Sequence, residues 1–167
     1  MDIGFDTGGM LLALQLIKLR WQKVWVTRSP RETQKLAGVI LEAVAAEGIN
    51  MVSVQGELGA GKTTLIQGLG KELGIRQNLP SPTFIIMRSY KLATGPWRQL
   101  DHLDLYRMDS DKEIRSVNLG EIWTDKANLV VIEWAERIKQ GLPKKYLAVE
   151  MKIKGEQDRE VRMRLCG

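Results

Sequence analysis

The chain has 167 residues, of which 44% are hydrophobic and 27% are charged, a composition typical of one soluble globular domain with a buried core. Its formal net charge is +5, but the basic residues are spread along the chain. A solvated surface therefore explains them better than a nucleic-acid interface does. A single cysteine, Cys166, excludes an intramolecular disulfide and a metal cluster held by several thiolates.

The first 22 residues are predicted to be an N-terminal extension of uncertain structure, and residues 23–167 to form a single domain. Residues 10–17 are apolar, but this run is far too short to span a bilayer. Asp2 and Asp6 also stand where a secretory signal is basic. A packed helix, a frayed tail and translation from an upstream start codon all fit the extension. We expect a cytoplasmic protein without a membrane partner.

The domain is predicted to begin with a strand, a helix and a second strand. Residues 23–27 alternate in polarity, as a strand does. Residues 29–32, with the sequence Ser-Pro-Arg-Glu, match a capping box with proline at the first helical position. Apolar residues then recur with helical period, which predicts a helix that ends at residues 48–50. Residues 51–54 predict a short buried strand.

Residues 56–63 match the pattern G-x-x-x-x-G-K-[ST] of a phosphate-binding loop, and residues 63–73 predict a helix after it. The glycines let the backbone bend so that successive N–H groups point at a phosphate. In such loops the Lys62 ammonium reaches the β- and γ-phosphates, and the Thr63 hydroxyl ligates Mg²⁺. The predicted nucleotide ligands in this segment are Glu57, Leu58, Gly59, Ala60, Gly61, Lys62, Thr63 and Thr64.

After the phosphate-binding loop the sequence predicts a hairpin and a further helix. Gly74 is expected to end the preceding helix, and residues 78–82, which include two prolines, form an irregular crossing. Residues 83–90 and 97–105 predict the two strands of the hairpin. A second capping box at residues 110–113 begins the next predicted helix.

The last part of the chain predicts a central strand and a closing hairpin. Residues 129–132 are continuously apolar, as in a parallel strand buried on both faces. Residues 146–153 and 159–165 predict the hairpin, with its turn near Gly155. The order of elements predicts an α/β fold of the P-loop NTPase type, a three-layer sandwich whose mixed sheet has a parallel centre and antiparallel edge strands.

Two acidic residues at predicted strand ends are candidates for catalysis. Glu133 follows four apolar residues in the Walker B arrangement, which carries it to the edge of the sheet where α/β proteins bind ligands. Asp104 is the second candidate, and a phosphate-binding loop needs such carboxylates to hold Mg²⁺ or to orient water. His102, the only histidine, shares a strand face with Asp104. We expect it to position Asp104, to line the site or to be structural.

Four blocks of the sequence, in this order and spacing, resemble the TsaE family (formerly YjeE), the small ATPases of bacterial tRNA threonylcarbamoyladenosine synthesis. The blocks are residues 56–64, 81–84, 102–107 and 132–134. The resemblance covers about residues 23–165. It implies ATP and Mg²⁺ as cofactors and the TsaD–TsaB pair as partner. In that family this pair modifies the adenosine next to the anticodon, so that TsaE meets tRNA only indirectly, and hydrolysis is thought to reset the complex between turnovers.

The resemblance also implies roles for single residues at the phosphates. Lys62 and Thr63 carry over as ligands of phosphate and Mg²⁺, and Glu133 carries over as an acid of the magnesium site. Asp104 carries over as an acid needed for hydrolysis. The predicted catalytic residues are therefore Lys62, Asp104 and Glu133, and the predicted metal ligands are Thr63 and Glu133.

Further positions are matched away from the phosphates. Residues 81–83 fall where a switch-like loop would approach the γ-phosphate. Thr33 matches a family position near the nucleotide base, and Arg159 matches a C-terminal nucleotide contact. Independently of the resemblance, Arg107 and Arg159 are possible counter-charges for phosphate or base contacts, although surface roles explain both better. Trp134 is placed to support the geometry beside Glu133, although packing explains it as well.

Three other functions compete with this prediction. A small-molecule kinase would need an acceptor pocket and arginines over the phosphates, and no arginine cluster follows the phosphate-binding loop. A nucleotide-gated binding module would not need hydrolysis, and a direct tRNA-binding protein would use the positive charge. Because the sequence contains no obvious arginine finger, we expect slow hydrolysis by the isolated chain.

Overall fold

The structure is a computed structural model that describes residues 22–108, 113, 119–138 and 141–167. The predicted extension before residue 22 lies outside the described residues. So does the second capping box at 110–113, except for Glu113.

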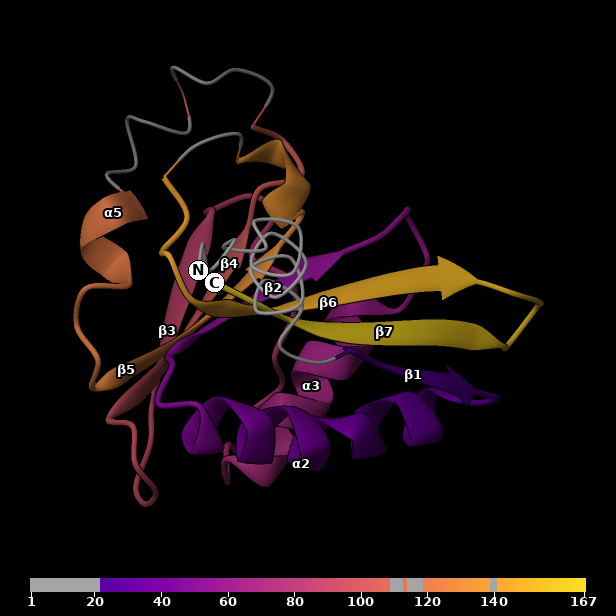
Figure 1. The fold of residues 1–167 in the computed structure, drawn as a ribbon, viewed down its shortest axis with the longest axis horizontal. Coiled ribbons are helices and arrows are strands. Elements are labelled where there is room, and N and C mark those ends of the chain that lie inside the picture. The colour runs from indigo at the N-terminus through magenta and orange to yellow at the C-terminus, as the bar shows by residue number, and fades with distance from the viewer. Residues whose placement is uncertain (1–21, 109–112, 114–118, 139–140) are drawn as a thin grey trace, which may run out of the picture.

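The described residues form one seven-stranded sheet in the order β1-β7-β6-β2-β5-β4-β3 (Figure 1). The four central strands β6, β2, β5 and β4 pair in parallel, whereas β1, β7 and β3 are antiparallel to their neighbours. This arrangement confirms the predicted mixed sheet. The strands are β1 (Gln22–Thr27), β2 (Met51–Gln55), β3 (Met87–Lys91), β4 (Gln99–Asp104), β5 (Asn128–Glu133), β6 (Tyr146–Ile153) and β7 (Arg159–Cys166).

Apolar residues on the two faces of the sheet form separate cores. One core packs α2 (Pro30–Ala46) and α3 (Lys62–Glu72) against the sheet. The other lies under α5 (Leu119–Ile122) and the short 3₁₀ helix η1 (Ala135–Arg137). Because side chains alternate along a strand, neighbouring residues of β5 serve different cores. The three predicted layers are thus present, with a lighter layer on the α5 side.

Local sequence signals set the ends of the two long helices. The Glu32 amide donates to the Ser29 hydroxyl at 3.2 Å, which caps α2 as the sequence predicts. After α3, Gly74 adopts a φ of 76°, and the Ile75 amide donates to the Gly70 carbonyl at 2.8 Å. These features form the Schellman end that glycine favours. No helix among the described residues is long and apolar enough to cross a bilayer.

The predicted strand at residues 83–90 is wrong at its beginning, because β3 starts only at Met87. Residues 83–86 instead form a turn, in which the amides of Ile85 and Ile86 both donate to the Pro82 carbonyl. Ile86 has a φ of 67°, in the left-handed region that β-branched residues rarely adopt. The apolar run looks like a strand in sequence, but contacts with a distant residue hold it as a turn.

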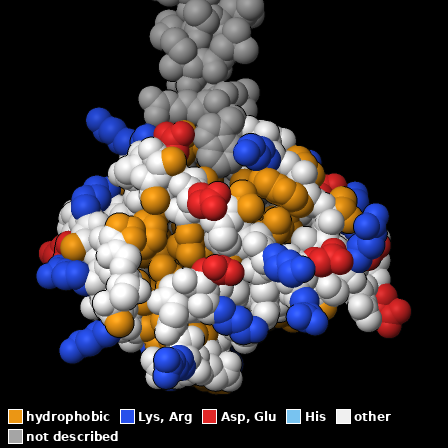
Figure 2. Space-filling model, turned by 90° about the horizontal axis from the view of Figure 1, so that it is seen from below, with side chains coloured by type: hydrophobic (Ala, Val, Ile, Leu, Met, Phe, Trp, Pro, Cys, Tyr) orange, Lys and Arg blue, Asp and Glu red, His pale blue; other side chains and the backbone are white. Residues whose placement is uncertain are grey.

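Lysine and arginine side chains are scattered over the face that carries α2, with acidic side chains between them (Figure 2). This mixture is typical of a solvated surface. It agrees with the solvated surface that the sequence favours as the explanation of the net charge.

Candidate active site

The phosphate-binding loop connects β2 to α3 in a conformation that its glycines permit. Gly56 has a φ of 141°, and a side chain there would place a Cβ atom 2.3 Å from the Met151 carbonyl oxygen. Only glycine therefore lets the loop leave β2 so close to β6. Gly61 precedes the first residue of α3 with a φ of 95°. The N-terminus of α3 is thus at the loop, where its partial positive charge favours anions.

The Lys62 side chain folds back onto the loop and is buried. Its Nζ donates to the carbonyl oxygens of Gly56 at 2.7 Å and Glu57 at 2.9 Å, and lies 3.7 Å from the centroid of the Trp134 ring. Burial lowers the pKa of the Lys62 ammonium below 10.5. Nearby carboxylates partly offset this shift, and they belong to Glu133, Glu136, Asp104 and Glu57.

Glu133, the last residue of β5, is buried between two side chains that hydrogen-bond to its carboxylate. The Thr63 hydroxyl lies 3.1 and 3.0 Å from the two carboxylate oxygens. On the other side, His102 Nε2 donates to Glu133 Oε1 at 2.9 Å. Because β4 and β5 are adjacent, His102 contacts Glu133 rather than Asp104, so of the three roles left open for it, the positioning of Asp104 is wrong.

Asp104 ends β4 directly beside Glu133 in the register of the sheet. Its Oδ2 accepts hydrogen bonds from the hydroxyls of Ser81 and, at 2.6 Å, Thr83. Its Oδ1 accepts from the Tyr106 amide at 2.8 Å. The loop of residues 81–83, predicted to be switch-like, is therefore fastened to the candidate catalytic carboxylate.

A cavity of about 400 Å³ lies between the phosphate-binding loop and the two carboxylates. It brings together the predicted residues Lys62, Asp104 and Glu133, and Leu58 and Tyr106 stand at its edge. Its full lining is Leu58, Gly59, Gly61, Lys62, Thr63, Thr64, Ser81, Thr83, Asp104, Tyr106, Glu133 and Trp134.

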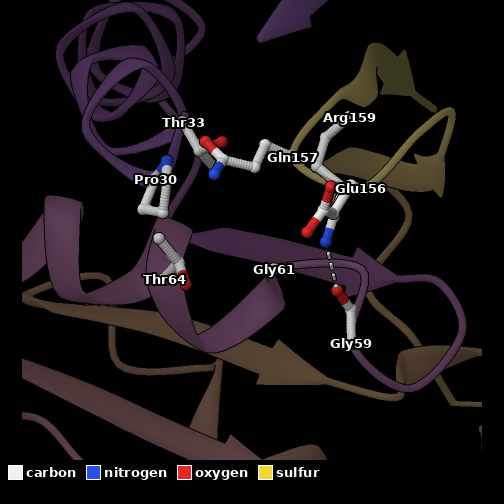
Figure 3. A pocket seen from close by; sticks show the side chains of 8 residues that line it. All are labelled: Pro30, Thr33, Gly59, Gly61, Thr64, Glu156, Gln157 and Arg159. Atoms are coloured by element: carbon white, nitrogen blue, oxygen red, sulfur yellow. Dashed lines mark hydrogen bonds between the residues drawn. The ribbon is translucent and has the colours of Figure 1, made fainter. Parts of the chain in front are cut away.

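A second pocket of about 260 Å³ lies on the other side of the loop, between α2 and the β6–β7 hairpin (Figure 3). Thr33 and Arg159 both line it, as the resemblance to the TsaE family implied. Arg159 Nη2 donates to the Gly59 carbonyl at 3.1 Å. In Figure 3 the Gln157 side chain extends from the hairpin toward Thr33 across the pocket.

The two pockets share Gly59, Gly61 and Thr64, so one elongated ligand could occupy both by lying across the loop. Ala60 is completely buried, and Glu57 lines neither pocket. These two predicted ligands could therefore contribute only backbone groups.

Four residues that take part in the site carry only weak signals in the sequence. His102 and Tyr106 flank Asp104 by two residues on either side, and Trp134 directly follows Glu133. These three residues could have been found from their positions beside the strand-end acids. Nothing in the sequence around Ser81 indicates by itself that it contacts Asp104. Arg107 lies outside the cavity lining, with its guanidinium 4.2 Å from the centroid of the Phe84 ring.

Comparison with known proteins agrees with this geometry. Residues 27–161 match the family model described as threonylcarbamoyl adenosine biosynthesis protein TsaE. The tRNA threonylcarbamoyladenosine biosynthesis protein TsaE of Bacillus subtilis is 34% identical over 146 residues, which are 87% of each chain. The protein of that name from a Nostoc species is 37% identical over 133 residues, which are 78% of each chain.

Among solved structures, the crystal structure of Bacillus subtilis YdiB superimposes with a TM-score of 0.67 at 30% sequence identity. The match covers 88% of this chain and 87% of that one. Family model, sequence relatives and fold agree over nearly the whole described domain, and the chain belongs to the TsaE family.

Proposed function

We propose that this protein binds and hydrolyses ATP with Mg²⁺, and that it serves tRNA threonylcarbamoyladenosine biosynthesis in the cytoplasm by acting on a TsaD–TsaB-like complex. Family membership supports the pathway. One observation carries the nucleotide chemistry. The loop residue Thr63 hydrogen-bonds to the strand-end acid Glu133, which places the two predicted metal ligands together beside Lys62.

Phosphate binding uses the backbone of residues 57–64 and the Lys62 ammonium. When ATP enters, Lys62 exchanges the carbonyls of Gly56 and Glu57 for phosphate oxygens, and there it offsets the charge that develops during transfer. The second pocket, with Thr33 and Arg159, receives the nucleoside on the other side of the loop.

The donor set at Thr63 and Glu133 fits Mg²⁺. A hydroxyl and a carboxylate are hard oxygen ligands, and Mg²⁺ is held in such sites by one or two protein groups together with substrate phosphates. No cluster of three or more histidine, cysteine or acidic side chains suited to a metal occurs in the described part of the chain. When bound, Mg²⁺ neutralises charge on the phosphates.

Asp104 orients the attacking water. Its carboxylate is engaged by Ser81 and Thr83, so hydrolysis by the isolated chain is slow until this loop moves. The cavity lining contains no arginine among the described residues. This lining favours a slow ATPase over a small-molecule kinase, because a kinase would clamp the transferred phosphoryl group with arginines.

A reconstituted modification reaction tests the proposal. Purified TsaD and TsaB, tRNA, a donor of the threonylcarbamoyl group and ATP with Mg²⁺ are combined with the wild-type chain, Lys62→Ala or Glu133→Gln. We expect multiple rounds of tRNA modification only with the wild type, together with ADP formation. Full ADP formation by Lys62→Ala would refute the site. Multiple rounds with a Glu133→Gln variant that binds ATP without hydrolysing it would instead establish a nucleotide-gated binding module.

A further inference from the structure

Two large apolar side chains are exposed directly beside the candidate active site. Phe84 is 82% exposed and Ile85 is 55% exposed, and both follow Thr83, which lines the cavity. Leu58 and Tyr106, also exposed, stand on the edge of the same cavity. Exposed apolar side chains that gather beside a functional site are typical of a protein contact. We call Phe84 and Ile85 the apolar turn.

The apolar turn is fastened to Asp104 at both ends. Before it, the hydroxyls of Ser81 and Thr83 donate to the Asp104 carboxylate. After it, the Ile86 carbonyl accepts a hydrogen bond from the Asp104 amide at 2.9 Å. A movement of the backbone of the apolar turn therefore acts directly on the hydrogen bonds of Asp104.

Backbone strain is concentrated around the same cavity. In the described chain, the non-glycine residues with positive φ are Ile86, at 67°, and Trp134, at 59°. One ends the apolar turn, and the other follows Glu133 and lies under Lys62. Strained backbone that surrounding contacts hold in place can relax when those contacts change, and such strain is common at switch regions.

Charge and shape indicate the kind of surface that the apolar turn fits. The Arg107 guanidinium lies over the Phe84 ring, 4.2 Å from its centroid, so a cation accompanies the exposed aromatic ring. Phe84 could stack on a base, but the aliphatic Ile85 beside it could not. An apolar protein pocket with carboxylates at its rim matches both the side chains and the charge.

We propose that the apolar turn is the docking contact for such a pocket on a protein partner. Docking draws the turn away from Asp104, which frees the carboxylate from Ser81 and Thr83 to orient water. This inference rests on the proposed function, whose TsaD–TsaB-like partner it assigns to a specific surface. Partner binding and activation of hydrolysis are then one event.

Variants of the apolar turn test this assignment. Neither Phe84 nor Ile85 lines the cavity, so the double variant Phe84→Ser/Ile85→Ser should keep wild-type ATP affinity and basal hydrolysis. Its affinity for a purified TsaD–TsaB complex with ATP and Mg²⁺ should fall at least about tenfold, and the complex should no longer stimulate its hydrolysis. Arg107→Glu should weaken the same binding, whereas Arg107→Lys should retain most of it.

A matched control exists at the opposite edge of the sheet, where Val24 and Val26 of β1 are 48% and 52% exposed. Val24→Ser/Val26→Ser makes the same kind of change, two exposed apolar residues to serine, and should bind and respond to the complex like the wild type.

If the apolar-turn variant also binds and responds like the wild type, the surface assignment is overturned while the proposed function stands. Stronger binding of the wild type to free tRNA than to the complex would also overturn it. If the wild type is not stimulated by the complex at all, the proposed function fails together with the assignment.

Discussion

At the scale of single residues, the site is organised around carboxylates that neighbouring side chains hold in place. Glu133 is buried and accepts hydrogen bonds from Thr63 and His102. A partner that orients a metal-binding carboxylate is commonly as necessary as the carboxylate itself. Among the described residues, His102 Nδ1 is buried without a hydrogen-bond partner. Its bond to Glu133 is therefore the polar contact by which the ring acts on the site.

Replacement of His102 should impair magnesium-dependent hydrolysis. In His102→Leu the carboxylate loses a donor and should turn away from Thr63, so that activity falls about 10–100-fold and more Mg²⁺ is needed for half-maximal rate. His102→Gln, whose amide can still donate from a similar position, should recover part of both. Steady-state hydrolysis across a Mg²⁺ titration measures this, with urea unfolding as a control for stability. Equal losses in the two variants would point to packing alone.

The depressed pKa of Lys62 predicts an alkaline limit to nucleotide binding. Burial lowers the pKa below 10.5, so the ammonium charge is lost at a lower pH than in an unfolded chain. ATP affinity should decline as pH rises toward 10.5. In the same window the unfolded chain holds more protons than the folded one, so Lys62 makes the free energy of unfolding rise with pH. Calorimetric titration with ATP across this range measures the decline. The Lys62→Arg variant stays charged throughout this range. It should bind ATP more weakly than the wild type, but its ATP affinity should change little with pH.

At the scale of elements, the position of the phosphate-binding loop depends on the close packing of α3 against α2. Gly68 of α3 faces the backbone of Gln34 on α2, where an added Cβ atom would lie 2.5 Å from the Gln34 carbonyl oxygen. The two helices can approach this closely only because a side chain is missing. Their distance in turn fixes where α3 begins, and hence where Lys62 and Thr63 lie.

Gly68→Ala should therefore destabilise the protein, although alanine has the better helix propensity. Steric overlap with backbone costs about 1–3 kcal/mol, which exceeds the gain of about 1 kcal/mol from propensity. Gly38→Ala in α2 is the matched control, because nothing lies within 4 Å of the added Cβ atom, and it should stabilise the protein slightly. Urea denaturation of both variants measures the difference. An unchanged midpoint for Gly68→Ala would show that the helices can separate freely.

The same elements show what a sequence can predict. The start of α2, the glycine end of α3 and the phosphate-binding loop depend on residues a few positions apart, and local chemistry predicts them. The turn at residues 83–86 depends on hydroxyls that reach Asp104 about twenty residues away. The contact between His102 and Glu133 depends on β4 lying beside β5. A local sequence pattern does not predict which strands are neighbours in a sheet.

At the scale of the whole molecule, the candidate site and the β1 edge lie apart in the sheet. Residues at the ends of β4 and β5 line the cavity, whereas β1 is the edge strand on the other side of β2 (Figure 1). β1 begins at Gln22 and pairs with β7 along its whole length, from Gln22 opposite Arg164 to Thr27 opposite Arg159. All seven described strands therefore lie at or after this residue.

A chain that begins at Gln22 should consequently fold and bind ATP like the full chain, as the prediction of a single domain at residues 23–167 requires. Thermal unfolding followed by circular dichroism, and calorimetric titration with ATP and Mg²⁺, measure these two properties. A loss of cooperative unfolding in the shortened chain would show that the first 21 residues belong to the domain.

The folded-back Lys62 has a consequence for how firmly the protein retains its nucleotide. Two of the three ammonium protons are already engaged by carbonyls of the loop, and the aromatic ring of Trp134 covers the group. An incoming phosphate must compete with these carbonyl oxygens for the Lys62 ammonium. The free energy of binding therefore contains only the difference between two sets of charge-assisted hydrogen bonds. The same exchange of hydrogen-bond partners, run in reverse, eases the release of the product nucleotide. As the phosphate leaves, the Lys62 ammonium returns to the carbonyl oxygens of the loop. Such a site favours repeated turnover over tight storage.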